Sequence, residues 1–244
     1  MLQPSVFRLP KAGSTQAEYE DAVAWSRRRG RFAVADGASA SAFARLWAQL
    51  LVQAYVGGRL SPCAIENDLA PVQARWSALV EQRNLPWYAV EQARRGAFAA
   101  LVGLEMHGDR TWTALAVGDC CLFQVRDHTL VEAMPLSDAE AFNARPMLLG
   151  SRASANTVLR DAGAIVTASG TWAVGDTFLL MSDALAAMFL RASSASPESP
   201  LHVFAFDRNP LGFRHWVHSA RSAQFLRNDD ASLLWLEVGV DAAA

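Results

Sequence analysis

Short apolar runs that end at an aspartate recur along this sequence, and they limit its fold more than any other feature does. Arg31–Ala35 leads into Asp36-Gly37, and Thr177–Met181 leads into Ser182-Asp183. Runs of this length and composition that stop at turn residues indicate β-strands. A carboxylate at a strand end is held by a rigid element and is still accessible, as a metal ligand must be.

Three more acidic points lie beside apolar runs. Thr111–Val117 ends at Gly118-Asp119, and a second strand-like run resumes at Leu122–Val125. The two runs therefore predict a hairpin with an acidic tip. The other two acidic points are Asp229 and Asp230, before Ser232–Val238, and Glu20 and Asp21, before Ala22–Trp25.

The segments between these strands have helical periodicity. Apolar residues between Phe43 and Tyr55 recur at the i, i+3, i+4 and i+7 spacing, and Gly57-Gly58 ends this helix. The same spacing predicts helices over Val72–Val80 and from about Val90 to Leu104. Strands in pairs between pairs of helices favour a layered α+β fold over a repeating βαβ unit. Shorter predicted elements are a strand over Ala164–Thr167 and helices over Ala184–Arg191 and around Trp216–Ala220.

Composition limits the class of protein. The chain has 244 residues, 52% of them hydrophobic, and a formal net charge of -2. With this composition and no linker-like stretch, we expect a single folded domain over residues 1–244. Balanced charge offers no general attraction for nucleic acid, and no apolar stretch is long enough to span a membrane. Three cysteines without a paired spacing, and an N-terminus without a signal peptide, predict a cytoplasmic protein.

Converging carboxylates with no histidine or cysteine among them favour a hard divalent cation, Mg²⁺ or Mn²⁺, over zinc. A single aspartate in a turn is ordinarily explained by its hydrogen bonds to nearby backbone N–H groups. The prediction of a divalent-cation site therefore rests on how many strands end at an acidic residue and on their order in the chain. The sequence has no G-x-S-x-G motif and no evident activated nucleophile, so nothing in it points to a covalent intermediate.

In the order of these motifs the sequence resembles the PP2C-type, metal-dependent Ser/Thr protein phosphatases (the PPM family), and most closely their compact bacterial branch. The resemblance extends from about Glu20 to Val238. No single motif is specific, but five in this order with these flanking strands are. They are Glu20-Asp21-Ala22, Phe32-Ala33-Val34-Ala35-Asp36-Gly37, Val117-Gly118-Asp119, Leu179-Leu180-Met181-Ser182-Asp183 and Asp229-Asp230-Ala231-Ser232.

The resemblance implies a fold and a set of residue roles. The family fold is a four-layer α-β-β-α sandwich of two antiparallel sheets flanked by helix pairs. Asp36 would bridge two metal ions, Mn²⁺ or Mg²⁺, and Gly37 would offer its carbonyl. Asp183 and Asp229 would bind the first metal. The other implied ligands are Glu20 and Asp21, which would hold the second metal through water, and Asp119, which in some members helps to bind a third, weaker metal.

The implied reaction is hydrolysis of a phosphoserine or phosphothreonine ester by a hydroxide held between the metals, with Asp36, Asp183 and Asp229 as the catalytic aspartates. We expect the substrate to be a protein phosphorylated by a Ser/Thr kinase and the enzyme to be a monomer, with no nucleic acid or membrane as partner. One alternative is a catalytically inactive phosphatase-like module that binds a partner or a phosphopeptide. Another is a hydrolase of small phosphorylated metabolites.

The sequence also departs from the family pattern. Many members place an arginine that holds phosphate just ahead of the Glu-Asp pair, and here Gln16–Tyr19 fills that stretch. Ala38–Ser41 replaces a histidine-containing segment, Ala184 replaces a glycine, and Cys120-Cys121 replaces Ser-Arg. The basic run Arg27–Arg29 is expected to be a solvated turn, with attraction of an anionic phosphosubstrate as the alternative.

Overall fold

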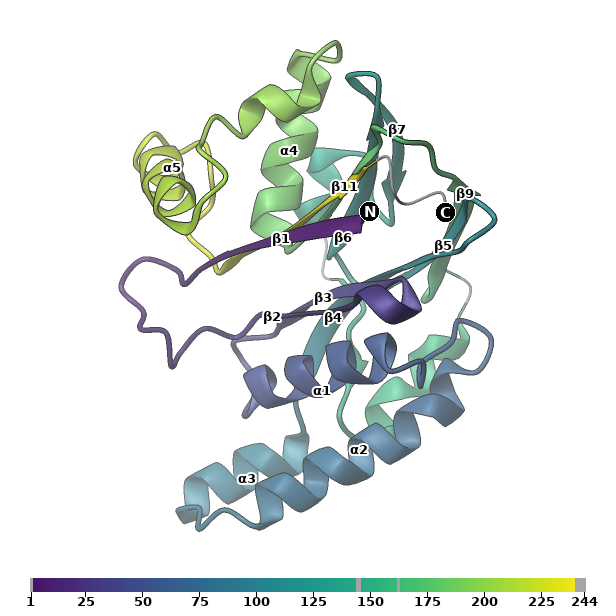
Figure 1. Ribbon diagram of the computed structural model, residues 1–244. Helices are drawn as coiled ribbons and strands as arrows, with labels where there is room; N and C mark the ends of the chain where they lie inside the picture. The colour runs from purple at the N-terminus through teal and green to yellow at the C-terminus, as the bar shows by residue number, and fades with distance from the viewer. Residues whose placement is uncertain (1, 144–145, 162, 240–244) are drawn as a thin grey trace.

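Two antiparallel sheets stacked face to face form the centre of the computed structural model, which describes residues 2–143, 146–161 and 163–239 (Figure 1). The first sheet has the strand order β1-β11-β10-β6-β7. The second has the order β2-β3-β4-β5-β9, and β8 pairs with β4. The strands are β1 Leu2–Leu9, β2 Ala22–Ser26, β3 Arg31–Gly37, β4 Phe98–Met106, β5 Thr111–Val117, β6 Cys121–Arg126, β7 Thr129–Met134, β8 Leu149–Gly150, β9 Val166–Thr171, β10 Thr177–Met181 and β11 Ala231–Val238.

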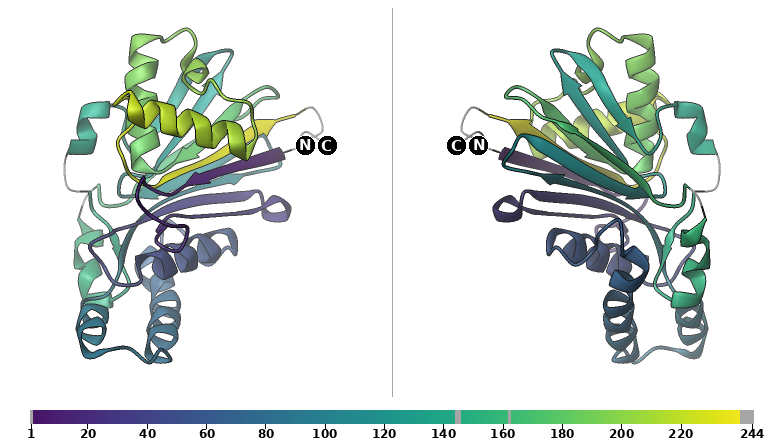
Figure 2. Two further views of the ribbon diagram at one scale, coloured as in Figure 1. Left: turned by 90° about the vertical axis from the view of Figure 1, so that its left-hand side faces the viewer. Right: turned by 90° about the vertical axis from the view of Figure 1, so that its right-hand side faces the viewer.

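Helices cover the outer faces of both sheets, so the molecule has four layers (Figures 1 and 2). Helices α1, α2 and α3 lie on the outer side of the second sheet. Helices α4 and α5 lie on the outer side of the first sheet. This architecture confirms the predicted α-β-β-α sandwich. The helices are α1 Ala44–Val56, α2 Ile65–Glu81, α3 Trp87–Arg95, α4 Asp183–Ala195 and α5 Pro210–Ser222.

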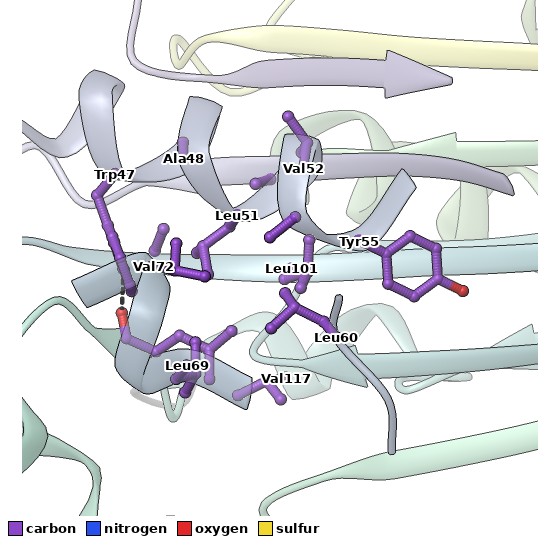
Figure 3. Packing of buried hydrophobic residues seen from close by; sticks show 14 of the residues in the cluster. Trp47, Ala48, Leu51, Val52, Tyr55, Leu60, Leu69, Val72, Leu101 and Val117 are labelled. Carbon is purple, nitrogen blue, oxygen red and sulfur yellow. Dashed lines mark hydrogen bonds between the residues drawn. The ribbon is translucent and has the colours of Figure 1, made fainter. Parts of the chain in front are cut away.

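Side chains that alternate along the strands fill two kinds of core, one between the two sheets and one between each sheet and its helices. In β3, Phe32 and Val34 point between the sheets, whereas Ala33 and Ala35 face α1. Small residues under α1 let the helix approach the sheet closely, and large apolar side chains of the helix fill the space (Figure 3). The indole N–H of Trp47 donates to the carbonyl of Leu149 at 2.8 Å, which satisfies the one polar atom of a fully buried side chain.

The helix predicted from about Val90 to Leu104 is wrong in its second half. Helix α3 ends at Arg95, Gly96 follows with a φ of +84°, and β4 begins at Phe98. β4 lies between β3 and β5 and is buried on both faces, so its sequence is a continuous apolar run. Such a run has no polar alternation that would distinguish a strand from a helix.

The hairpin predicted around Asp119 is also wrong. β5 belongs to the second sheet and β6 to the first, so Gly118 and Asp119 carry the chain from one sheet to the other. Gly118 has a φ of +94°, and a Cβ there would lie 2.6 Å from the Cβ of Ala100. The two runs are consecutive in the sequence without being hydrogen-bonded neighbours, a distinction that a local pattern does not encode.

The other predicted elements differ only in their limits. The strand predicted over Ala164–Thr167 begins at Val166 and continues to Thr171, and the helix after Asp183 extends to Ala195. The turn predicted at Arg27–Arg29 is a short 3-10 helix between β2 and β3. Among the described residues, no helix is both long and apolar enough to cross a lipid bilayer.

Candidate metal centre

The acidic residues of the second sheet lie at one end of its strands. Ala22 of β2 pairs with Ala35 of β3, so Asp21 and Asp36 are neighbours just beyond that pair. β5 runs antiparallel to β4 and ends at this same edge, and Asp119 follows it. We call this end of the strands, with Asp21, Asp36 and Asp119, the acidic edge. The basic run Arg27–Arg29 lies at the opposite end of β2, far from it.

The first sheet contributes its acidic residues from the same end of the sandwich. Met181, the last residue of β10, pairs with Cys121, the first residue of β6. Asp183 and Asp119 therefore lie close to the same edge. β11 runs antiparallel to β10 and begins beside this edge, shortly after Asp229. The topology thus brings together acidic residues that are up to about 200 positions apart in the chain.

Four of the predicted aspartates line one cavity of about 310 Å³, together with the backbone segment that follows Asp36. Glu20 instead lines an adjoining cavity of about 680 Å³, and Ser39 belongs to the walls of both. Asp21 is buried and lines neither of these two cavities. We call the smaller one the acidic cavity. Its wall includes the four aspartates and one glycine: Asp36, Gly37, Asp119, Asp183 and Asp229.

The aspartates raise one another's pKa values. Burial is the main cause of a pKa of Asp36 well above its ordinary value, and the charges of Asp21, Asp183, Asp119 and Asp229 add to it. Burial and then the charge of Asp183 raise the pKa of Asp119 to about 6. A group of carboxylates that resist ionisation in this way has a strong preference for a positive partner.

Asp21 gives the clearest indication of what that partner would be. Its two carboxylate oxygens are buried and have no hydrogen-bond partner. Burial, followed by the nearby charge of Asp230, raises its pKa to about 8. Unsatisfied buried carboxylates are rare in folded proteins because they cost stability. The all-oxygen donor set around Asp36 therefore fits a hard divalent cation.

The coordination shell itself is not assembled. Within residues 2–143, 146–161 and 163–239, no three His, Cys, Asp or Glu side chains are already arranged to hold a metal ion. The guanidinium of Arg227 forms ion pairs with both Asp183 and Asp229 and occupies part of the acidic cavity. An arginine thus neutralises two of the carboxylates that a cation would otherwise draw together.

The adjacent aspartates 229 and 230 have different surroundings. One carboxylate oxygen of Asp230 accepts the backbone N–H of Lys11 at 2.8 Å, and the other accepts that of Glu20 at 2.7 Å. Asp230 therefore fixes the loop between β1 and β2, and each of its carboxylate oxygens already accepts one backbone N–H. Asp229 lines the cavity, which favours it over Asp230 as the ligand.

Several residues near the acidic edge were not identified from the sequence. The hydroxyls of Tyr19 and Ser232 are hydrogen-bonded to each other in the buried layer that contains Asp21. Lys11 donates to Ser39 at 3.0 Å and lies 3.6 Å from Glu20. Of these residues, only Arg227 could have been found from the sequence. It lies two residues before Asp229, and a cation beside an acidic pair can act as its counter-ion.

Comparison with known proteins identifies the fold. No family model matches the sequence, and no curated protein sequence matches it. Among solved structures, PppA, a key regulatory component of T6SS in Pseudomonas aeruginosa, is 22% identical, with a TM-score of 0.55 over 97% of each chain. The catalytic domain of the Ser/Thr protein phosphatase PstP, in complex with two manganese ions, is 15% identical, with a TM-score of 0.60 over 98% of each chain.

A third similar structure is the Ser/Thr phosphatase Stp1 from Staphylococcus aureus, 10% identical, with a TM-score of 0.66 over 98% of this chain and 95% of that one. The class defined by the two-sheet sandwich is therefore the PP2C-type phosphatase fold. This chain has that fold over nearly its whole length, as the order of its acidic motifs predicted.

Proposed function

We propose that this protein is a metal-dependent phosphatase that hydrolyses phosphoserine or phosphothreonine in proteins. One observation carries the proposal: four aspartates from both sheets line a single cavity at the edge of a PP2C-type fold. The similarity to Ser/Thr phosphatases, one of them holding two manganese ions, supports the same activity. The proposed cofactors are two Mn²⁺ or Mg²⁺ ions, with a third, weaker site.

The surroundings of Asp36 support its proposed role as the central ligand. Asp36, whose pKa is raised by burial and then by the charges of four other aspartates, would be the shared ligand, together with the Gly37 carbonyl. Asp183 and Asp229 would complete the first site. A pair of divalent cations held here would lower the pKa of a water and neutralise the phosphate oxygens. The remaining proposed ligands are Glu20 and Asp21 for the second cation and Asp119 for the weaker third.

The cysteines give no support to a covalent mechanism. Burial raises the pKa of the Cys120 thiol well above its ordinary value, and nearby carboxylates raise it further. Burial likewise raises the pKa of Cys121. Both thiols stay protonated at neutral pH and are poor nucleophiles. Direct attack of water on phosphorus is consistent with these surroundings.

A non-catalytic binding module is the second candidate function. The observation that favours it is the ion pairing of Arg227 with Asp183 and Asp229, which neutralises part of the acidic cavity without a cation. A hydrolase of small phosphorylated metabolites would use the same cavity. Of these candidates we propose the protein phosphatase. We propose further that it is a single domain over residues 1–244, monomeric and cytoplasmic, and that its substrate is a protein phosphorylated by a Ser/Thr kinase.

The test is hydrolysis of a phosphothreonine peptide and of p-nitrophenyl phosphate in Mn²⁺, in Mg²⁺ and in EDTA. We expect turnover of both substrates that depends on the metal and stops in EDTA. Turnover of the small ester alone would favour a metabolite hydrolase. No turnover by folded protein with either metal would contradict the proposed activity and favour the binding module.

A further inference from the structure

Arg227 is the one positively charged residue among the described residues that line the acidic cavity. Its guanidinium forms an ion pair with Asp183 and a second with Asp229 at 3.2 Å. About half of its side chain is exposed to solvent. It can therefore contact a ligand that enters from solvent.

The turn that carries Arg227 is held in place without help from its guanidinium. Leu226 is buried, the side-chain carbonyl of Asn228 accepts the backbone N–H of Ala12 at 2.7 Å, and Arg221 donates to the backbone carbonyl of Asp229 at 2.5 Å. The backbone of residues 226–229 is thus fixed against the loop between β1 and β2 and against α5. The guanidinium is free to exchange partners while it stays at the same cavity.

A cation and this guanidinium compete for the same carboxylates. Asp183 and Asp229, the two partners of Arg227, are both proposed ligands of the first cation. When their charge is used by a divalent cation, the arginine loses its partners and faces a cavity that has become more positive. A phosphate monoester dianion in that cavity then offers it a pair of oxygens, and a planar guanidinium binds such pairs through two parallel hydrogen bonds.

We propose that Arg227 is the residue that binds the phosphoryl group of the substrate. It exchanges the carboxylates of Asp183 and Asp229 for the phosphate oxygens once cations occupy the cavity. This inference rests on the proposed function, because it takes the ligand to be a phosphate ester. Many PP2C-type phosphatases hold phosphate with an arginine in the stretch that Gln16–Tyr19 fills here. In this chain, the arginine would instead come from the turn before β11.

Lys11 is the competing cation that contacts Ser39, a residue shared by both cavities. It lies in the adjoining cavity, where it is hydrogen-bonded to Ser39 and close to Glu20. Ser39 separates it from the aspartates, and it contacts none of the residues proposed for the first cation. The structure therefore favours Arg227, and Lys11→Gln serves as the direct test of the other assignment.

The first experiment measures binding of inorganic phosphate to the Mn²⁺-loaded protein by isothermal titration, for wild type, Arg227→Gln and Arg227→Lys. We expect Arg227→Gln to weaken phosphate binding by about tenfold or more, the size of a lost charge-assisted hydrogen-bonding pair. Arg227→Lys should fall between them, because an ammonium keeps the charge but not the planar fork. Arg208→Gln is the matched control, since Arg208 is also half exposed and ion-paired, to Glu237, outside the cavity.

The second experiment measures Mn²⁺ affinity without phosphate. Arg227→Gln should bind Mn²⁺ more tightly than wild type, because the competing guanidinium is gone; a purely structural role would not produce this gain. Steady-state kinetics with p-nitrophenyl phosphate should show a raised KM in Arg227→Gln and the wild-type KM in Arg208→Gln. Thermal unfolding in Mn²⁺ confirms that each variant is folded.

Unchanged phosphate affinity in Arg227→Gln would overturn the inference, and so would a loss of phosphate binding in Lys11→Gln alone. The activity of the enzyme is a separate result, because phosphate binding is measured without turnover. A wild type that binds phosphate through Arg227 and hydrolyses no ester would contradict the proposed phosphatase and still support this role of Arg227.

Discussion

At the scale of single residues, the acidic edge is defined by the cost of burying negative charge. Asp36 has a raised pKa because of its burial and its four acidic neighbours, and Asp21 has no hydrogen-bond partner for either oxygen. Neither arrangement is favourable in a protein that keeps its carboxylates ionised. Cation binding would remove this cost, and for that reason metal affinity and carboxylate ionisation are expected to be linked.

The metal-free protein should lose stability as the pH rises. The pKa of Asp119 is raised to about 6 and that of Asp21 to about 8, both above the value of the unfolded chain. The folded state therefore binds more protons, so its extra stability is complete below about pH 4 and is lost as the pH rises through about 6 and 8. Urea unfolding in EDTA measures this trend.

Asp21→Asn isolates the contribution of one group to that trend. We expect this variant to be more stable than wild type at about pH 8 in EDTA, by on the order of 2 kcal/mol, since it removes a buried charge. The difference should shrink at about pH 5, where Asp21 of the folded protein is protonated. Equal unfolding free energies at both pH values would contradict this account of Asp21.

The sequence predicted the four aspartates that line the cavity, but Glu20 and Asp21, predicted with them, lie outside its walls. How each aspartate is used was not evident from the sequence. Every aspartate of the cavity follows or precedes an apolar strand, so its place at a strand end could be inferred locally. The difference between Asp229 and Asp230 depends on which of them meets the loop between β1 and β2, a contact across more than 200 residues. The position of the Arg227 guanidinium likewise depends on three-dimensional packing. The roles of the aspartates as ligands stay a prediction.

At the scale of elements, the fit between α1 and β4 supports the strand that leads to Asp36. β3 pairs with β4 along the whole length of β3, and α1 packs across both strands. Gly103 of β4 lies against the ring of Tyr55, and a Cβ at this position would be 2.3 Å from that ring. The glycine is required by close packing and not by its backbone conformation.

Gly103→Ala should therefore destabilise the protein, by about 1 to 3 kcal/mol, because the added methyl group forces the Tyr55 ring and α1 away from the sheet. Gly108→Ala is the matched control, since a Cβ at Gly108 meets nothing within 4 Å. Chemical unfolding of the two variants measures the difference. Equal stabilities for both variants would show that α1 is not packed against β4 as described.

Helix α1 was predicted well and β4 was not, although β10, which is also buried on both faces, was predicted with its exact limits. The helix between Phe43 and Tyr55 has an exposed stripe, and its predicted limits agree with α1 to within a residue. β4 has no such stripe, so its apolar run was assigned to a helix. The sheet partners of β5 and β6 were mistaken for a similar reason, because strand pairing is set by the whole fold and not by a local turn.

At the scale of the whole molecule, the acidic cavity connects the two sheets. Asp36 belongs to the second sheet, Asp183 and Asp229 flank strands of the first, and Asp119 lies where the chain crosses between them. A cation bound by this set would therefore stabilise the packing of one sheet on the other. The layered α+β class could be predicted from the sequence, and the order of acidic motifs then led to the PP2C-type fold.

Mn²⁺ should raise the unfolding temperature of the wild type above its value in EDTA. At a free Mn²⁺ concentration about 100 times Kd, linkage gives about 2.7 kcal/mol, or about 5 to 10 °C for a chain of this size. Differential scanning calorimetry measures the shift, and NaCl at the same ionic strength is the control. The same unfolding temperature in Mn²⁺ and in EDTA would show that the acidic cavity binds no such cation.

The most direct test of the proposed phosphatase is turnover of a phosphothreonine peptide in Mn²⁺ by wild type and Asp36→Asn, with circular dichroism to confirm folding. Asp109→Asn is the matched control, because Asp109 is exposed in the turn between β4 and β5, at the far end of the sandwich from the cavity. We predict that Asp36→Asn lowers kcat by about 100-fold or more, as the loss of a central electrostatic contact does, while Asp109→Asn keeps wild-type activity. Turnover by Asp36→Asn at the wild-type rate would contradict a reaction centred on Asp36.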